Sequence, residues 1–599
     1  MSSSPRRERK LPSRCVSDPL EDERERGEAR LFRTLLGSCY GPQGGLKLLR
    51  NAVGGPTVAT STSAVLLPAL HPPGPVLRLL AAAVRGHLGR RGDGGLFVAL
   101  LASLLLEGGW GMEVPPGLTG RVQGRLLQLC ESYLRSEECA CRLRVDLGSL
   151  PRLLSLVLTV LGSKPACLLS RRTARHVSTA LLRSFLHTVP SSGPARGDGG
   201  DDGRPTTVTL GHAVLVSAVG PPVEETRVLP GLLVETPEVA VSVAGGSPGA
   251  EGSIRVAVFN TSLSGDVAEG GERELCHEVA VGVSAHGATL AQLLSLGERL
   301  LALGVRLLAC QKVVHPALCQ FMEERGARVL DRLGASLVEP LCRLTGARPL
   351  GSLAGVVTPA QLGLVQGTDG VRVGEKRFLH LRGMDAPAPP VCTLVLCHRN
   401  DAALAELKLA CQAAQHALQA LLKEPLALFG GGCTETHLAA YIRHAAMGMS
   451  EELLQELRCS RAQVRSVASH LAGALEAVAC TLSQGRGTHL VDSRFGHLWV
   501  AWRVALPDED WEAVLQSCAC GAVVSPPPGV SWRWLGQRGH RDSTSLGDEA
   551  TAPTPLLAPP DPPPSLLLDS FTVRSNALQV AVEVASLLLD VKCTIEDTN

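Results

Sequence analysis

Apolar side chains recur at alternating steps of three and four residues along residues 402–424. This spacing places them on one face of an α-helix, and Pro425 ends the helix because proline lacks the amide donor that the next turn needs. The same pattern runs from Leu578 to Leu589 near the C-terminus. We therefore predict two long core helices, one in the second half of the chain and one at its end.

The middle of the chain has a different pattern. Short apolar runs alternate with amphipathic stretches, and glycine marks several of the changes. The pattern predicts a strand, a helix, a strand and a helix at residues 305–310, 315–325, 327–330 and 335–344. Two further strand candidates are residues 228–235 and 254–260. Since strands that alternate with helices usually form a largely parallel sheet, we predict a separate α/β domain over residues 213–365.

Length and charge narrow the class of protein. A chain of 599 residues is too long for one hydrophobic core, so it should form two or more domains. Its 58 Lys and Arg residues nearly balance 57 Asp and Glu residues, which gives no indication of a nucleic acid partner. The longest apolar runs, 96–106 and 153–161, are shorter than the roughly 20 residues needed to cross a bilayer. We expect a cytoplasmic protein without membrane insertion.

Two stretches and the N-terminus are expected to lack regular structure. Residues 1–30 are rich in charge and have no apolar core of the kind that a signal peptide needs, so they predict a disordered arm. Residues 191–206 are rich in Gly, Asp and Pro, and residues 525–564 carry a dense run of prolines. Both are expected to be surface loops.

The chain has 19 cysteines but no export signal, so reduced thiols are expected. Cys139 and Cys141 are separated by one residue, as are Cys518 and Cys520. Structural zinc sites usually have two to four residues between paired ligands, and neither pair has a second pair close to it in the sequence. The sequence therefore predicts no metal site.

Three glycine-rich segments could bring backbone amides close to a phosphate. Residues 39–49 lack the Gly-Lys-Ser/Thr ending of a Walker loop, so a turn between helices explains them as well. In residues 92–95, Asp93 could hold a metal-bound phosphate, yet the same four letters recur in the low-complexity segment 197–200. The triple glycine 430–432 fits close helix packing as well as ligand binding. No segment decides the question alone.

The order and spacing of these segments resemble the group II chaperonins over nearly the whole chain. The matching features are Gly41-Pro-Gln-Gly44 with Lys47, His71-Pro72, Gly92-Asp-Gly94, Gln311-Lys312, Thr345-Gly346-Ala347, Gly430-Gly-Gly432 and residues 568–573. Within that family, residues 38–42, 310–313, 430–443 and 495–499 look similar to the Bardet-Biedl group of chaperonin-like proteins.

The resemblance implies a mixed α/β multidomain chain with the group II chaperonin fold. It implies a helical equatorial domain at residues 1–148 and 429–599, which includes the disordered arm 1–30 and the Pro-rich disordered insertion 525–564. The intermediate hinge domain would comprise residues 149–212 and 366–428, and the α/β apical, substrate-binding domain residues 213–365. Stretches flanking 229–233 and a helix at 290–303 are the candidate protein-binding surfaces.

In this family, ATP hydrolysis requires carboxylates that hold Mg²⁺ and one that orients the attacking water. The resemblance puts Thr62 where the first aspartate belongs. Counting with Glu406 as the anchor, it puts Ala413 where the water-orienting carboxylate belongs. Because loss of such a group usually lowers the rate about 10²- to 10⁴-fold, we expect no hydrolysis and no other carboxylate in the gap.

Nucleotide binding is a separate question. Asp93 is kept, but Gly95 and Leu96 replace the two threonines that follow it in the family. The resemblance implies a degenerate nucleotide site without a metal, made of Gly41, Pro42, Gly44, Asp93, Gly94, Gly431 and Asp569. No cofactor is required, and binding of ATP with Mg²⁺ stays open. Lys164 is expected to be a solvated loop residue and His437 a helix-surface histidine.

The resemblance implies a chaperonin-like assembly factor without ATPase activity. Its implied partners are subunits of the cytosolic chaperonin ring, the other Bardet-Biedl chaperonin-like proteins and the BBSome, which it would help to fold or assemble for ciliary function. The implied location is the cytoplasm and the centrosome or basal body. The alternatives are an ATP-hydrolysing protein-folding chaperonin subunit and a monomeric binding module. We expect no stable homo-oligomeric double ring, because prolines after Ser525 interrupt the expected hairpin.

Overall fold

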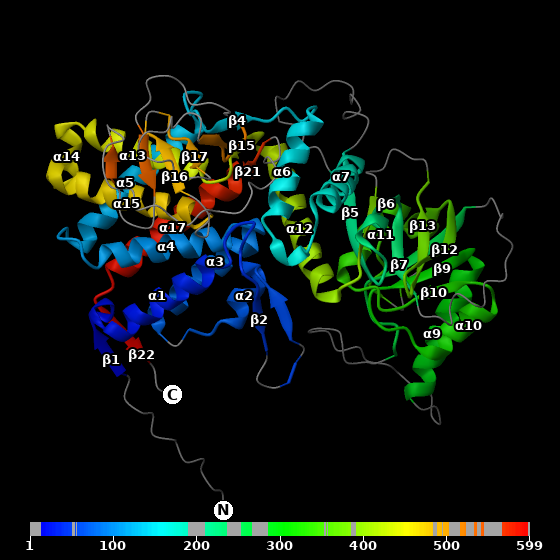
Figure 1. The fold of residues 1–599 in the computed structure, drawn as a ribbon. Coiled ribbons are helices and arrows are strands. Elements are labelled where there is room, and N and C mark those ends of the chain that lie inside the picture. Colours follow the sequence, from blue (N-terminus) through cyan, green and yellow to red (C-terminus); the bar gives the residue numbers. More distant parts are fainter. Residues whose placement is uncertain are drawn as a thin grey trace, which may run out of the picture. The chain divides into compact units, whose positions relative to one another are not determined.

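The computed structural model describes residues 14–596, apart from 51–53, 56, 73, 190–209, 237–252, 266–284, 353–354, 356, 385–390, 483–487, 494, 502–514, 523–531, 536–540 and 544–565. The chain forms two compact units. Met1–Ser178 and Ala405–Asn599 make up the first, called here the helical unit, and Thr179–Leu404 make up the second, the α/β unit. The chain passes between them within helices α7 (Arg171–Thr188) and α12 (Asp401–Lys423) (Figure 1). The division into three domains remains a prediction.

Helices dominate the helical unit (Figure 1). They are α1 (Glu23–Gly37), α2 (Ser63–Ala69), α3 (Pro75–Arg91), α4 (Gly95–Gly109), α5 (Pro116–Arg135), α6 (Leu150–Gly162), α13 (Cys433–Met447), α14 (Glu451–Leu457), α15 (Arg461–Thr481) and α17 (Phe571–Leu589). Helix α4 packs against α1, α3, α15 and α17. It is buried on nearly every side because its sequence is apolar all round. The predicted core helix at the C-terminus is α17, and the predicted helix at 402–424 is α12.

Small sheets surround these helices. One antiparallel sheet has the order β21-β15-β4, with β4 at Arg142–Arg144, β15 at Leu426–Phe429 and β21 at Leu568–Ser570. A five-stranded sheet has the order β18-β17-β16-β19-β20, formed by Leu515–Cys518, Leu498–Ala501, Thr488–Asp492, Trp532–Leu535 and Arg541–Ser543. Two pairs, β2 (Lys47–Leu49) with β3 (Val58–Thr60) and β1 (Arg14–Ser17) with β22 (Cys593–Glu596), complete the unit.

Two predictions of disorder are wrong in part. Within the predicted arm 1–30, β1 pairs with β22 and α1 begins at Glu23, where the Asp22 side chain accepts a hydrogen bond from the amide of Arg24. Within the predicted insertion 525–564, β19 pairs with β16 and β20 pairs with β19. Pairing with distant strands supplies backbone hydrogen bonds that local composition does not reveal. The remaining residues of both stretches lie outside the described residues, as does 191–206.

In the part of the α/β unit that the structure describes, the strands form three sheets (Figure 1). The first has the order β10-β9-β8-β11, formed by Arg328–Leu330, Val305–Cys310, Ile254–Phe259 and Gly363–Val365. Strands β8, β9 and β10 run parallel, as the sequence predicts. The connecting helices are α9 (Ala285–Ala302), α10 (Pro316–Glu324) and α11 (Ala335–Thr345). The predicted strand–helix–strand–helix order at 305–344 is therefore confirmed.

The other two sheets complete the α/β unit. One has the order β12-β13-β7, at Gly367–Val373, Lys376–Arg382 and Leu232–Glu235, and the other β5-β14-β6, at His212–Val219, Val391–His398 and Arg227–Pro230. The single strand predicted at 228–235 is thus two strands, divided at Gly231, whose φ of 92° turns the chain. Single 3₁₀ turns lie at Pro19–Glu21, Pro165–Cys167, Val223–Glu225 and Pro359–Gln361.

The apolar side chains of two proposed protein-binding stretches are largely internal. Leu232 and Leu233 are 0% and 1% exposed, so they belong to the core. On α9, Leu293, Leu296 and Leu300 are buried as well. Any protein-binding surface here must use the residues around these leucines rather than the leucines themselves.

Candidate nucleotide pocket

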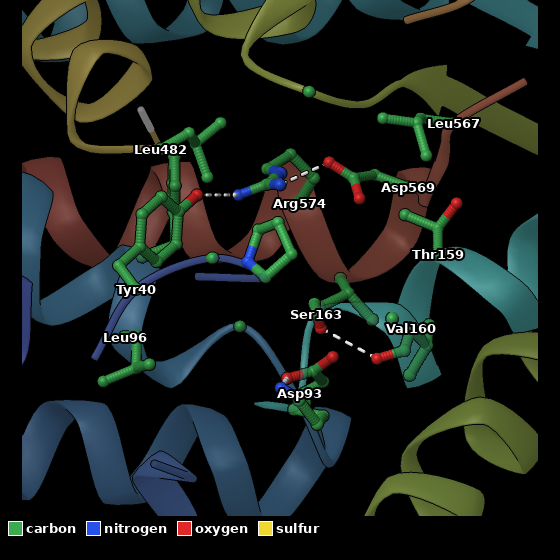
Figure 2. A pocket seen from close by; sticks show the side chains of 18 of the residues that line it. Tyr40, Asp93, Leu96, Thr159, Val160, Ser163, Leu482, Leu567, Asp569 and Arg574 are labelled. Carbon is green, nitrogen blue, oxygen red and sulfur yellow. Dashed lines mark hydrogen bonds and ion pairs between the residues drawn. The ribbon is translucent and has the colours of Figure 1, made fainter. Parts of the chain in front are cut away.

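The helical unit contains a cavity of about 490 Å³, a size that suits a small ligand (Figure 2). Loops and helix ends that are far apart in the sequence form its wall. Predicted site residues that line it are Gly41, Pro42, Asp93, Gly94, Gly431 and Asp569, together with Ala413. Gly44 and Thr62 are not among the lining residues. The structure therefore brings most of the predicted degenerate site into one place.

The N-terminus of α4 faces this cavity through Asp93 and Gly94. Gly94 has a φ of 84°, and a Cβ there would lie 2.9 Å from Nε2 of His87. The same nitrogen lies 2.9 Å from the carbonyl oxygen of Asp93. His87 is buried, and burial lowers its pKa, which favours the neutral imidazole that holds this turn. A helix N-terminus with free amides favours an anion such as phosphate.

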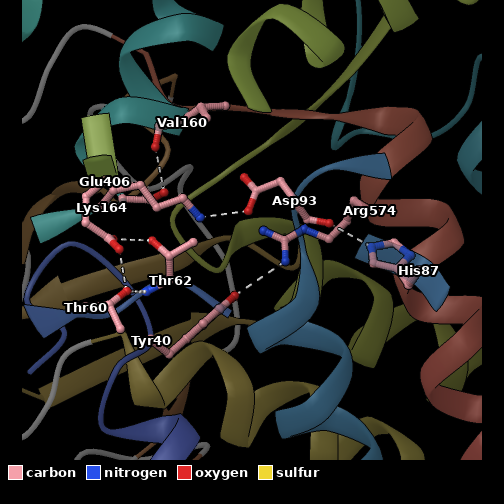
Figure 3. Close-up of polar contacts among 10 residues, drawn as sticks. Tyr40, Thr60, Thr62, His87, Asp93, Val160, Lys164, Glu406 and Arg574 are labelled. Carbon is pink, nitrogen blue, oxygen red and sulfur yellow. Dashed lines mark hydrogen bonds and ion pairs between the residues drawn. The ribbon is translucent and has the colours of Figure 1, made fainter. Parts of the chain in front are cut away.

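Lys164 reaches Asp93 across the cavity wall (Figure 3). Its ammonium nitrogen lies 2.7 Å from Oδ1 of Asp93, and the two side chains are only 12% and 25% exposed. Burial by itself raises the pKa of Asp93, but the Lys164 ammonium and the Gly94 amide outweigh it and lower that pKa. The prediction that Lys164 is merely solvated is wrong, because a distant carboxylate folds against it. Asp93 therefore carries an internal counter-ion.

The gap left by Thr62 contains an acid that the sequence interpretation used only as an alignment anchor. Glu406 on α12 is 2% exposed. Its Oε1 accepts a hydrogen bond of 2.5 Å from the Thr60 hydroxyl, and its Oε2 accepts one of 2.6 Å from the Thr62 hydroxyl (Figure 3). A carboxylate therefore lies beside Thr62, and the expected absence of another carboxylate at the phosphate position itself stays a prediction. Both oxygens are nevertheless occupied, and Glu406 is not among the lining residues.

Ala413 lies on the same helix as Glu406, and its methyl group lines the cavity. It is 5% exposed and offers no atom that could accept a proton from water. The structure thus places the predicted water-orienting position at the cavity, with an apolar side chain there.

Arg574 on α17 is a site residue that the sequence interpretation missed. Figure 2 shows its guanidinium between Tyr40 and Asp569. It forms an ion pair with Asp569, donates a hydrogen bond of 3.4 Å to the Tyr40 hydroxyl and lies 3.4 Å from Oε1 of Glu435. Its Cζ also lies 4.5 Å from the centre of the Phe97 ring. The signal available was an arginine five positions after Asp569, which alone is not specific.

Burial determines the protonation of this group of residues. It raises the pKa of Glu435, and Asp569 raises it further, while Arg574 lowers it. Burial also raises the pKa of Tyr40, so the phenol stays neutral. Arg574 keeps its charge: burial disfavours the cation, but Asp569 and Glu435 raise its pKa above the ordinary value. Asp569, one of the predicted nucleotide-site residues, is engaged by this arginine.

Close packing explains the triple glycine, while ligand binding by it stays a prediction. Gly431 lines the cavity with a φ of 70°. A Cβ at this position would lie 2.8 Å from the carbonyl oxygen of Ala519, closer than real Cβ contacts. Close packing against residues 518–520 therefore requires glycine here, whether or not a ligand binds.

The expected surface position of His437 is wrong, whereas the absence of a metal site stays a prediction, although the fold brings distant ligand groups to both cysteine pairs. Cys518 and Cys520 lie beside Cys433 and His497, and Cys139 and Cys141 lie beside His437, so neither cysteine pair lacks neighbouring ligand groups. His437 is 9% exposed rather than on the helix surface.

Among the described residues, no helix has the length and apolar character required to cross a membrane.

Comparison with known proteins shows which family this chain resembles. The model of the TCP-1/cpn60 chaperonin family matches residues 32–492. The mouse protein named Molecular chaperone MKKS is 40% identical over 594 residues, which cover 99% of this chain and all of the relative. The human protein of that name is 39% identical with the same coverage. Thermosome subunit alpha of Sulfurisphaera tokodaii is 24% identical over 70% of this chain and 73% of its own length.

These matches cover residues of both the helical unit and the α/β unit. The resemblance to chaperonins that the motifs indicate is confirmed, and the chain belongs to the TCP-1/cpn60 chaperonin family.

Proposed function

We propose that this protein is a chaperonin-like assembly factor that binds other proteins without hydrolysing ATP. One observation carries the proposal: among the described residues, the carboxylates of Asp93, Asp569, Glu406 and Glu435, at or beside the pocket, each contact a cation or a donor within the protein, Glu435 through its ion pair with Arg574. Asp93 pairs with Lys164, Asp569 pairs with Arg574, and Glu406 accepts hydrogen bonds from two threonines.

Hydrolysis needs free carboxylate oxygens, because Mg²⁺ takes oxygen ligands and the attacking water needs a base or an orienting group. A metal ion at Asp93 would have to compete with an ammonium 2.7 Å away. At Ala413 the water would meet a methyl group. The residues described here therefore do not fit a complete magnesium site, and we derive no hydrolytic step from them.

Weak nucleotide binding is compatible with this proposal. The cavity of about 490 Å³, the N-terminus of α4, and the cations Lys164 and Arg574 favour an anionic ligand. Both cations already have an acidic partner, which reduces what they can offer to a phosphate. A bound nucleotide would act as a structural ligand.

We extend the proposal to partners and location. The resemblance to the Bardet-Biedl chaperonin-like group favours action with cytosolic chaperonin ring subunits and with the other members of that group, in the folding or assembly of the BBSome. It favours the cytoplasm and the centrosome or basal body as the location. The similarity to proteins named molecular chaperones supports the general role.

A phosphate-release assay on the purified full-length protein with Mg²⁺ and ATP tests the lack of hydrolysis. The expected rate equals the background, and Asp93→Ala leaves it unchanged. Turnover that Asp93→Ala abolishes would favour the alternative, an ATP-hydrolysing folding chaperonin. A thermosome preparation serves as the active control.

Partnership needs a separate experiment. Affinity purification of the tagged full chain from ciliated cells, followed by mass spectrometry, should recover chaperonin ring subunits and BBSome components. A purification that recovers neither, while the protein is folded, contradicts the assembly role but says nothing against the lack of hydrolysis.

A further inference from the structure

Four potential metal ligands meet beneath the wall of the pocket. Cys433 begins α13, His497 lies between β16 and β17, Cys518 ends β18, and Cys520 follows it. The three cysteines are 0% exposed, and His497 is partly buried. These four residues are called here the Cys₃His cluster.

The spacing of the ligand atoms is close to that of a tetrahedron around one ion. Zinc binds sulfur at about 2.3 Å and imidazole nitrogen at about 2.0 Å, so tetrahedral edges are about 3.8 Å between two sulfurs and about 3.5 Å between sulfur and nitrogen. In the cluster, Sγ of Cys518 lies 3.3 Å from Sγ of Cys433 and 3.4 Å from Sγ of Cys520. Nδ1 of His497 lies 3.5 Å and 3.8 Å from the sulfurs of Cys518 and Cys520.

All four atoms lie within 4.8 Å of one another. Only small adjustments would centre an ion among them. Three thiolates and one imidazole form a closed set of four ligands, which is typical of structural rather than catalytic zinc.

A disulfide explains this arrangement less well. Disulfide sulfurs are about 2.05 Å apart, much closer than the separations here, and a bond between any two cysteines would leave the third thiol and the imidazole without a function. Soft thiolate ligands with an imidazole in tetrahedral order select zinc over magnesium or calcium.

The backbone holds the ligands in position. The amide of Gly521 donates to the Cys518 carbonyl at 2.9 Å, which closes the turn that aims Cys518 and Cys520 in the same direction. The amide of Ala522 lies 3.4 Å from Sγ of Cys520, as amides around metal-bound thiolates do. This tight turn is why a spacing of one residue can supply two ligands.

A second cluster gives an internal contrast. Cys139 and Cys141 lie near His437, but both ring nitrogens of that histidine are used. Nδ1 lies 2.6 Å from the Phe495 carbonyl oxygen, and Nε2 lies 2.7 Å from the Tyr133 hydroxyl. This cluster therefore offers two thiols without a free imidazole, and it is the natural control.

We propose that Cys433, His497, Cys518 and Cys520 bind one Zn²⁺ ion that fixes the wall of the pocket. Cys433 directly follows the triple glycine, and Ala519, between two of the ligands, lines the cavity. The Cys520 carbonyl accepts a hydrogen bond of 2.9 Å from the Leu567 amide, and the Leu567 carbonyl accepts one of 3.0 Å from the Gly430 amide. The ion would join the glycine loop, the β16–β17 turn and residues 518–520.

Binding of the metal displaces the thiol protons and adds its binding free energy to the stability of these loops. The metal site takes no part in ATP hydrolysis. The zinc proposal and the proposed function can therefore be tested separately.

The first test measures metal in the purified full-length protein, made in zinc-supplemented cells and passed through a desalting column with a weak chelator. Elemental analysis and native mass spectrometry should find about one zinc per chain. Cobalt should replace the zinc and give thiolate-to-cobalt charge-transfer bands with the strong visible bands of a tetrahedral ion. A wild-type protein that holds no zinc and takes up no cobalt overturns the proposal.

Cysteine variants then test which residues bind the zinc. Cys518→Ser with Cys520→Ser should lose the zinc, whereas Cys139→Ser with Cys141→Ser should keep it. A second control, Cys15→Ser with Cys593→Ser, removes exposed thiols that could hold adventitious metal. Loss of zinc in either control, with retention in the first variant, overturns the assignment.

A measurement on the unmodified protein guards against variants that fail to fold. Thiol alkylation with peptide mass spectrometry should label Cys433, Cys518 and Cys520 much faster after a strong chelator is added, while Cys139 and Cys141 keep the same rate. An equal response of both clusters to the chelator contradicts the proposal.

Discussion

The ammonium nitrogen of Lys164 lies 2.7 Å from Oδ1 of Asp93, although 71 positions separate the two residues in the chain. Asp93 is the acidic residue that the chaperonin motif retains here. Asp93 lines the cavity, but its carboxylate is already paired with the ammonium group of Lys164. A metal-bound phosphate in the cavity would need that carboxylate charge to be available. The consequences of this pair, and of its neighbours, can be measured.

Replacement of Lys164 by Met should destabilise the protein by about 2 kcal/mol at pH 7, between the values of exposed and fully buried ion pairs. The pKa of Asp93 is lowered in the folded state. The ion pair therefore stabilises the folded protein fully at pH values above the ordinary aspartate pKa of about 3.9, and this stabilisation is lost as the pH falls below that value. Urea unfolding from pH 7 to pH 3 should show the difference from wild type shrink below about pH 4. Lys164→Arg is the control that keeps the charge. A difference that does not change with pH would assign the effect to packing instead.

Introduction of the family's aspartate at position 62 should be unfavourable in this protein. Thr62→Asp removes the hydroxyl that donates to Glu406 and places a second carboxylate beside it. We expect a loss of about 2–4 kcal/mol at pH 7. Like charges raise the pKa of the pair in the folded state, so part of the loss should be regained as the pH falls to 5. Chemical denaturation at both values checks this, with Thr62→Ser as the variant that keeps the donor. Unchanged stability in Thr62→Asp would show that the Thr62–Glu406 bond contributes little.

Replacement of Arg574 by Met should cost about 3–5 kcal/mol at pH 7, because Asp569 and Glu435 remain as partly or fully buried acids without a cation. The pKa of Glu435 is already raised by burial and should rise further. The loss relative to wild type should therefore be smaller at pH 5, where Glu435 takes up a proton more readily. Glu435→Gln in the Arg574→Met background should restore part of the stability. If it restores none, Arg574 acts through its packing on Phe97 rather than through charge.

His489, a cavity-lining residue of β16, should make the protein sensitive to mild acid. It is 4% exposed, and burial lowers its pKa to about 4. Because the unfolded side chain takes up a proton near pH 6.5, stability falls as the pH drops from 6.5 toward 4, by about 2 kcal/mol at pH 5. His489→Leu should remove this part of the decline in unfolding experiments at pH 7 and pH 5. His71→Leu, at an exposed position, is the matched loss of an imidazole. Equal slopes for His489→Leu and wild type would contradict the assignment.

Local pattern predicted the elements well where periodicity was strong. The strand–helix alternation of β9, α10, β10 and α11 and the long helix α12 lie within a few residues of their predicted bounds, whereas α17 begins at Phe571, before the predicted stripe at Leu578. The density of prolines led to a wrong prediction of disorder at β19, which pairs with the distant strand β16, and at β20, which pairs with β19. The density of charged residues likewise led to a wrong prediction of disorder at β1, which pairs with β22.

Residue identities, together with the resemblance to chaperonins, indicated the family motifs, Thr62 in place of the expected aspartate and the methyl group at position 413. They also determined that Gly41, Asp93, Gly431 and Asp569 belong to one candidate site, and the cavity brings these four together. Only the tertiary structure decided which charges neutralise one another: Lys164 with Asp93, Arg574 with Asp569, and Glu406 with two threonine hydroxyls. It likewise decided that Cys433 and His497 join Cys518 and Cys520. Hydrogen bonds, ion pairs and metal sites depend on distances of a few ångströms in space, and separation along a chain does not encode those distances.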